Sequence, residues 1–131
     1  MIKRVLMTGN EGYIGSVAAA YLADAGYEVT GLDTGYFRDC TLGTNVRPVK
    51  TIHKDLRDLN RDDLEGFDAV IHLAALSNDP IGNLNREWTT SINVDGTKHL
   101  AELAKAAGVQ RFLFSSSCIM YGSKNADVVN E

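Results

Sequence analysis

Three glycines spaced three residues apart, Gly9, Gly12 and Gly15, follow a short apolar run and precede an apolar pattern of helical period. Glycine accepts backbone angles that a Cβ makes costly, so a tight strand-to-helix turn favours it. Because glycine has no side chain, a phosphate can come close to the backbone N–H groups at the helix N-terminus. The helix dipole favours the negative charge of the phosphate there. The spacing G-x-x-G-x-x-G differs from the common dinucleotide fingerprint G-x-G-x-x-G, so the neighbouring sequence must decide what the turn does.

The residues after the triplet predict a helix over Tyr13–Ala25, which Gly26 ends. Its expected apolar face consists of Ile14, Val17, Ala18, Tyr21, Leu22 and Ala25. A second strand over Glu28–Asp33 then ends on an acid eighteen positions after Gly15. A carboxylate at about twenty residues from the turn binds the adenosine ribose in dinucleotide-binding βαβ units. The pattern therefore predicts nucleotide binding, with an Asp33 that only caps the following loop as the alternative.

Composition restricts the class of protein further. The 131 residues suffice for one domain with a core, and we interpret residues 1–131 as a single dinucleotide-binding domain. The net charge of −4 argues against non-specific binding to nucleic acid or anionic membranes. We recognise no membrane-spanning run and no signal peptide, and Cys40 and Cys118 have no metal-type spacing. We expect free thiols in a cytoplasmic protein without a metal.

Strand and helix patterns alternate along the chain, which predicts parallel βαβ units. The expected fold is α/β, a doubly wound parallel sheet of five strands in the order 3-2-1-4-5, with both faces covered. The remaining predicted elements are strands over Val49–Lys54, Ala69–Leu73 and Arg111–Ser116, a short helix over Asn60–Glu65 capped by Asn60, and a long helix running from about Asn85 to Ala107.

Ligands of such sheets bind at the carboxyl ends of the strands, and polar or small residues follow each predicted strand. These ends are Thr8–Gly9, Asp33, Asp55–Asp58, His72–Ala75 and Ser115–Ser117. Taken singly, each has an ordinary structural explanation. Asp55 and Asp58 could be solvated loop carboxylates, the serines could be polar residues at a strand end, and His72, with apolar neighbours, favours a packed residue over a base.

Together the motifs resemble the N-terminal part of an extended short-chain dehydrogenase/reductase of the NAD-dependent sugar-nucleotide epimerase/dehydratase family, which has a Rossmann fold. The matching segments, in the order of the family, are Thr8–Gly15, Leu32–Asp33, Asp55–Asp58, Val70–Ala75, Asn93–Thr97, Ala107–Phe112 and Phe114–Gly122.

The resemblance implies roles for individual residues of the rim. Backbone N–H groups around Glu11–Ile14, with that of Tyr13 among them, would hold the pyrophosphate in the turn formed by Gly9, Gly12 and Gly15. Asp33 would bind the adenosine ribose, and Asp55 and Leu56 would flank the adenine. Further cofactor contacts would come from Leu73, Ala74, Ala75, Asn93 and Ser115, although Asn93 is equally well explained as a structural hydrogen-bonding residue. Ser117 matches the catalytic Ser/Thr of the family, which bonds a sugar oxygen.

The acid at position 33 favours NAD over NADP, because it repels a 2′-phosphate. No Arg or Lys lies between Gly9 and Gly15 to receive that phosphate, and Arg38 is the one later candidate. The family often has Gly or Ala where this chain has Asn10 and Glu11. We expect the Glu11 side chain to point to solvent, away from the phosphates.

The Tyr-x-x-x-Lys pair that moves protons in the family does not occur in this sequence. We therefore expect a truncated half of an enzyme, inactive alone, whose intact parent acts on a nucleotide sugar by hydride transfer to NAD. Dehydratases of the family place acids directly after the catalytic Ser/Thr, where this chain has Cys118 and Ile119, so epimerase-like chemistry is favoured. The alternatives are a non-catalytic dinucleotide-binding module and an NADP-dependent reductase. Relatives commonly dimerise through helices, and the long helix is a candidate for such an interface.

Overall fold

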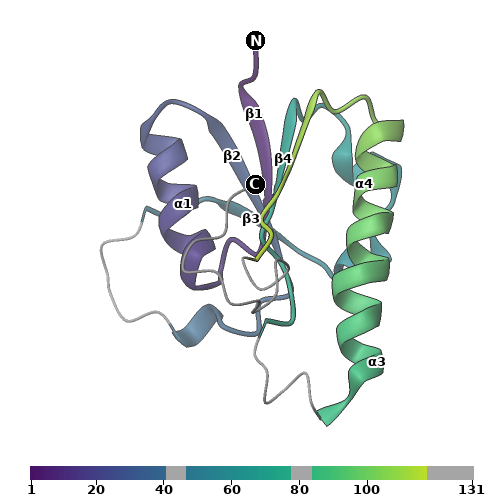
Figure 1. The fold of residues 1–131 in the computed structure, drawn as a ribbon. Coiled ribbons are helices and arrows are strands. Elements are labelled where there is room, and N and C mark those ends of the chain that lie inside the picture. The colour runs from purple at the N-terminus through teal and green to yellow at the C-terminus, as the bar shows by residue number, and fades with distance from the viewer. Residues whose placement is uncertain (41–46, 78–83, 118–131) are drawn as a thin grey trace, which may run out of the picture.

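The computed structural model describes residues 1–40, 47–77 and 84–117. Five parallel strands form one sheet in the order β3-β2-β1-β4-β5, which confirms the predicted fold. Figure 1 shows α1 on one side of this sheet and the α3–α4 column on the other. The strands are β1 (Arg4–Thr8), β2 (Glu28–Asp33), β3 (Lys50–His53), β4 (Ala69–His72) and β5 (Arg111–Phe114).

The strand register brings the carboxyl ends of all five strands to one rim. Thr8 at the end of β1 pairs with Leu32 of β2 and with His72 of β4. Asp33 pairs with His53 at the end of β3, and His72 pairs with Phe114 at the end of β5. The predicted convergence of strand ends is therefore correct.

The hydrophobic core cluster lies on the side of the sheet that carries α4 (Thr97–Ala106). Leu100 and Ala104 of α4 are buried there. Two short 3₁₀ helices, η2 (Leu56–Asp58) and η3 (Arg61–Leu64), contribute leucines to the same core. Its buried members are Leu6, Leu32, Leu56, Leu59, Leu64, Val70, Leu100 and Ala104.

The predicted short helix after Asn60 is η3, a 3₁₀ helix rather than an α-helix. Its predicted cap is confirmed, because the Asn60 side chain accepts from the N–H groups of Asp62 and Asp63. The Asp63 carboxylate accepts in return from the Asn60 N–H at 2.8 Å, which completes a capping box. A short segment is thereby fixed by its own side chains beneath the end of β3.

The predicted apolar face of α1 (Tyr13–Asp24) is wrong. The buried residues of α1 are Gly15 and Ala19, whereas Ile14, Val17 and Tyr21 are more than 60% exposed. The glycine turn brings the helix so close to the strands that only small residues fit between them. The period of the apolar residues was correct, but their stripe faces outward.

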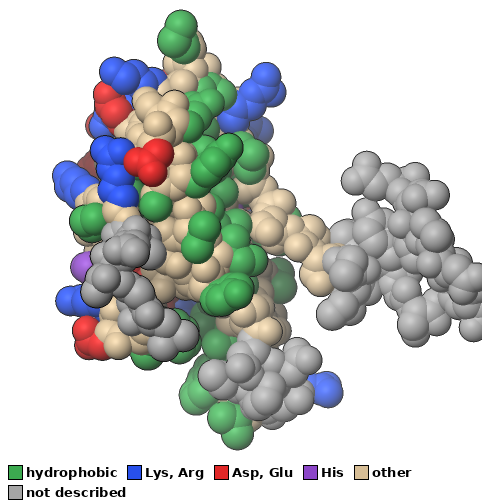
Figure 2. Space-filling view, turned by 90° about the vertical axis from the view of Figure 1, so that its left-hand side faces the viewer, with side chains coloured by type: hydrophobic (Ala, Val, Ile, Leu, Met, Phe, Trp, Pro, Cys, Tyr) green, Lys and Arg blue, Asp and Glu red, His purple; other side chains and the backbone are tan. Residues whose placement is uncertain are grey.

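This outward stripe lies on the side of the molecule that faces the viewer in Figure 2, where hydrophobic side chains gather along the surface. The sheet is also less covered than expected at β5, where Leu113 and Phe114 are more than half exposed. In the part of the chain that the structure describes, several apolar residues of α1 and β5 are therefore exposed.

The predicted long helix consists of three consecutive segments, α3 (Arg86–Thr89), the π-helical segment η4 (Thr90–Gly96) and α4. A π-helical turn widens the backbone spacing and is frequent at functional sites. Here it carries Asn93, one of the predicted site residues. Within the described ranges, no helix is long and apolar enough to cross a membrane.

Candidate functional site

The glycine turn lies against the ends of β2 and β4. Gly9 has a φ of +74°, and its N–H donates to the carbonyl of Leu32 at 2.8 Å. A Cβ at Gly9 would lie 2.8 Å from the backbone N of Ala74, closer than atoms can approach. The absence of this side chain therefore allows the turn and the segment after β4 to form one continuous surface.

The N-terminus of α1 is open toward the rim. Gly12 is the N-cap residue, and no side chain caps the helix. Gly12 and Ser16 donate their N–H groups within the chain, whereas those of Tyr13, Ile14 and Gly15 have no backbone or side-chain acceptor among the described residues. Unpaired helix N–H groups form a site for an anion such as a phosphate. The open N-terminus of α1 can thus accept an anion such as a phosphate.

Asp33 joins this turn to the loop after β2. Its Oδ2 accepts from the Glu11 N–H at 3.0 Å and its Oδ1 from the Gly35 N–H at 2.9 Å. The loop-capping role considered for this residue is thus present. Each carboxylate oxygen accepts more than one hydrogen bond, so capacity for ligand hydroxyls remains. The two backbone bonds fix the carboxylate at the rim in one orientation.

Glu11 does not point to solvent, contrary to the prediction. Its Oε1 lies 2.9 Å from His53 Nε2, and only 18% of its side chain is exposed. The turn at Gly9 and Gly12 directs the side chain back over the ends of β2 and β3, where an imidazole is available. His53 gave no signal in the sequence, because no pattern there indicated a partner for Glu11.

Asn10 is a second residue of the turn whose role the sequence did not reveal. Only 5% of Asn10 is exposed, and its Nδ2 donates to Thr51 Oγ1 at 2.9 Å. A Cβ at Gly31 would overlap the Asn10 side-chain amide. Asn10 therefore packs the turn against β2 in the space that Gly31 leaves open. No sequence pattern indicated this contact between the two residues.

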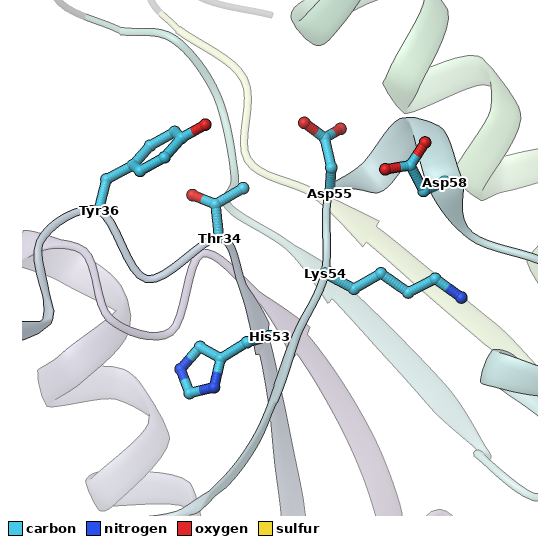
Figure 3. Close-up of a pocket in the computed structure, with 6 residues that line it drawn as sticks. All are labelled: Thr34, Tyr36, His53, Lys54, Asp55 and Asp58. Atoms are coloured by element: carbon cyan, nitrogen blue, oxygen red, sulfur yellow. The ribbon is translucent and has the colours of Figure 1, made fainter.

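A pocket of about 360 Å³ opens at the ends of β2 and β3. Figure 3 shows His53 and Lys54 projecting to opposite sides of the chain at the end of β3, with Asp55 above them. Lys54 reaches Asp63 at 2.6 Å and is thus turned away from His53. The pocket is lined by Thr34, Tyr36, His53, Lys54, Asp55 and Asp58.

Asp55 is held in this pocket by Arg57. The guanidinium donates to both carboxylate oxygens, from Nε to Oδ1 at 2.9 Å and from Nη2 to Oδ2 at 2.7 Å. These bonds hold the pKa of the Asp55 carboxyl below its usual range, against the opposing effect of burial. Leu56 beside it is only 5% exposed and belongs to the core.

His72 is a packed residue, as predicted, and it links two elements. Its Nδ1 lies 2.6 Å from Thr8 Oγ1 and its Nε2 2.8 Å from Thr97 Oγ1. Thr8 Oγ1 accepts from the Ala74 N–H, and Thr97 Oγ1 donates to the carbonyl of Asn93. Full satisfaction of this chain requires a neutral imidazole with the proton on Nε2. We call these four side-chain bonds the His72 relay.

The His72 relay predicts that stability depends on pH. Burial lowers the pKa of His72 from 6.5. The unfolded chain then takes up the proton first, so stability is full above about pH 6.5 and is lost as the pH falls toward the lowered folded pKa. Melting curves between pH 8 and pH 5 should show this loss, and His72→Gln should reduce its slope. Equal slopes for both proteins would contradict the assignment.

Asn93 holds the segment after β4 from the side of η4. Its Oδ1 accepts from the Leu76 N–H at 2.7 Å, and its Nδ2 donates to the Leu76 carbonyl at 3.0 Å. The structural role considered for Asn93 is therefore present. Together with the His72 relay, it fixes the backbone of Leu73, Ala74 and Ala75 beside the glycine turn.

The serines follow β5 at the same rim. The Ser115 N–H donates to the carbonyl of His72 at 3.2 Å and so extends the ladder by one residue. Ser115, Ser116 and Ser117 are exposed. Cys118 and Ile119, on which the preference against dehydration depends, lie outside the described residues, as does Tyr121. Among the described residues, no group of three or more His, Cys, Asp or Glu could hold a metal ion.

A parallel sheet with an open helix N-terminus after β1 and a fixed carboxylate after β2 defines a dinucleotide-binding α/β domain. The NAD dependent epimerase/dehydratase family matches residues 5–131. The chain belongs to this family, whose cofactor is NAD.

Known proteins resemble the chain in sequence and in fold. It is 36% identical over 126 residues to a UDP-glucose 4-epimerase of Streptomyces lividans, covering 93% of this chain and 38% of the relative. A UDP-N-acetylglucosamine 4-epimerase from Methanobrevibacter ruminantium M1 superimposes with a TM-score of 0.86 at 28% identity, covering 99% of this chain and 43% of that one. An NAD dependent NDP-hexosamine 5,6-dehydratase, TunA, superimposes with a TM-score of 0.82 at 29% identity, covering 98% of this chain and 42% of that one.

Proposed function

We propose that this chain is the NAD-binding portion of a sugar-nucleotide epimerase. The observation that carries the proposal is the cradle formed by the open N-terminus of α1 and the Asp33 carboxylate at one rim. Membership of an NAD-dependent family supports NAD as its ligand. NAD would supply a hydride acceptor for a sugar carbon.

The residues of this chain would bind and orient that cofactor. The N–H groups at the start of α1, including those of Tyr13 and Ile14, would bind the pyrophosphate. Asp33 would accept from the adenosine ribose, and Asp55 and the Leu56 backbone would flank the adenine. Small residues at Ala74 and Ala75 leave room along the β4 segment. Asn93 would support that segment, and Ser115 would lie toward the nicotinamide ribose.

Ser117 would bond a sugar oxygen and thereby position the substrate. Five UDP-glucose 4-epimerases that are 32–36% identical to this chain favour epimerisation as the reaction of the intact protein. Cys118 and Ile119 offer no carboxylic acid for dehydration. The substrate would be a nucleotide sugar. We further propose a cytoplasmic protein whose residues 1–131 form one domain of a longer enzyme.

Calorimetric titration of the 131-residue chain with NAD tests the proposal. We expect saturable binding of one NAD, and no turnover of UDP-glucose because the Tyr-x-x-x-Lys pair does not occur in the sequence. Absence of NAD binding would refute the function. Turnover of UDP-glucose would refute the inactivity of the chain, and a native product that binds NAD but carries no Tyr/Lys pair would favour a non-catalytic module.

Substitution of Asp33 gives a sharper test. Asp33→Asn is expected to weaken NAD binding by about tenfold, because one acceptor oxygen and the charge are lost together. Asp24→Asn is the matched control, since Asp24 ends α1 and pairs with Arg47 at 2.8 Å, outside the rim. Similar NAD affinities for Asp33→Asn and Asp24→Asn would contradict the ribose role.

A further inference from the structure

A second carboxylate, that of Glu11, lies beside Asp33 at the ends of β2 and β3. We call this place the Asp33 corner. Glu11 donates its own N–H to Asp33 Oδ2 at 3.0 Å, and its side chain folds over the ends of β2 and β3. His53 Nε2 holds Glu11 Oε1 at 2.9 Å. Glu11 Oε2 is buried and has no hydrogen-bond partner among the described residues. A buried carboxylate oxygen without a partner is costly, so its retention calls for a role beyond packing.

The turn at Gly35 relates this oxygen to Asp33. The Gly35 N–H donates to Asp33 Oδ1, and a Cβ built on Gly35 would lie 3.6 Å from Glu11 Oε2. The same position lies 3.0 Å from Nη2 of Arg38. Two carboxylates, one guanidinium and the His53 imidazole, whose Cδ2 lies 3.2 Å from that position, therefore surround a single turn and act on whatever binds beside it.

An adenosine ribose beside Asp33 presents either a 2′-hydroxyl, as in NAD, or a 2′-phosphate, as in NADP. A carboxylate accepts a bond from the hydroxyl but repels the phosphate. At a partly buried corner this repulsion is stronger than in water, because the effective dielectric constant is lower. Glu11 adds a second negative charge to that of Asp33, and it also opposes the positive charge of Arg38, which approaches the same turn.

We propose that Glu11 is a specificity-determining residue that disfavours NADP, and that His53 is the positioning residue that holds its carboxylate at the corner. The proposal rests on the proposed binding of the adenosine ribose beside Asp33. It assigns the discrimination against a 2′-phosphate to two carboxylates, of which only Asp33 follows the general dinucleotide-binding pattern.

The test compares the affinities of NAD and NADP for each variant by calorimetry. Glu11→Gln removes the charge and retains an amide that His53 can bond. We expect the ratio of the two dissociation constants to shift about tenfold toward NADP, which corresponds to about 1.4 kcal/mol. The shift should shrink as salt is raised, because screening weakens the repulsion. His53→Ala should give a smaller shift in the same direction.

Glu28→Gln is the matched control, because Glu28 is also a carboxylate of the β2 region but pairs with Lys3 at the opposite end of the strand. It should leave the ratio unchanged. Should Glu11→Gln not fold, Glu11→Ala provides the same test, since it removes the same carboxylate. A ratio altered less than twofold, with NAD still bound, would overturn the inference alone. Failure of the unaltered chain to bind NAD would overturn the proposed function as well.

Discussion

Gly15→Ala is expected to lower the free energy of unfolding by about 3 kcal/mol and to weaken NAD binding by more than tenfold. A Cβ at this position would overlap the Gly9 carbonyl oxygen and lie 2.7 Å from Asn10 Cα. Both contacts are with backbone atoms, so no side-chain rotation can relieve them. The N-terminus of α1 must instead move away from the turn, which separates the N–H groups of the cradle.

Gly12→Ala is the control for this substitution. Among the residues that the structure describes, a Cβ at Gly12 would contact only the Gly9 carbonyl oxygen, at 3.2 Å, and the Gly12 φ of −80° suits alanine. We expect little change in stability but weaker NAD binding, because the added methyl group lies at the open N-cap. Urea unfolding followed by circular dichroism separates the two cases. A Gly15→Ala chain as stable as the unaltered chain would contradict this account of the turn.

His72→Leu is expected to cost about 2–4 kcal/mol of stability. Leucine fills a similar space but leaves the Thr8 and Thr97 hydroxyls without the imidazole, and Thr8 is fully buried. Because Thr8 Oγ1 also accepts from the Ala74 N–H, the segment beside the glycine turn should loosen. Hydrogen exchange at Ala74 and Leu76 should therefore become faster, and NAD binding weaker.

His72→Gln tests whether the hydrogen bonds or the volume matter. Its amide offers one donor and one acceptor, so it should recover part of the stability and of the exchange protection. A ¹⁵N spectrum of the unaltered chain should show a neutral imidazole protonated at Nε2 at pH 7. Protonation at Nδ1, or equal stability of the leucine and glutamine variants, would contradict the His72 relay.

The sheet order could be predicted because apolar strands, helices and glycines alternate in a pattern that admits few topologies. The strand ends were correct for the same reason, since a parallel register aligns them. The face of α1 was wrong because periodicity identifies a stripe but not what it touches. Close approach at Gly15 places small side chains inward, and this distance cannot be read from the sequence.

The side-chain partners at the rim could not be predicted from the sequence either. Glu11 and His53 lie 42 positions apart, and His72 and Thr97 lie 25 apart, so only the fold brings them together. Asn93 could be placed on the long helix but not bonded to Leu76, because the π-helical segment η4 alters the direction of its side chain. Local patterns thus located the rim, and tertiary contacts decided how its atoms are used.

The fit of Asn10 over Gly31 restricts the order in which the two positions can change during evolution. An alanine at 31 would overlap the Asn10 amide, so a larger residue there is acceptable only after position 10 has become small. Conversely, asparagine could arise at 10 only in a lineage that already had glycine at 31. Positions 10 and 31 should therefore covary. While asparagine occupies position 10, substitution of the glycine at position 31 is selected against.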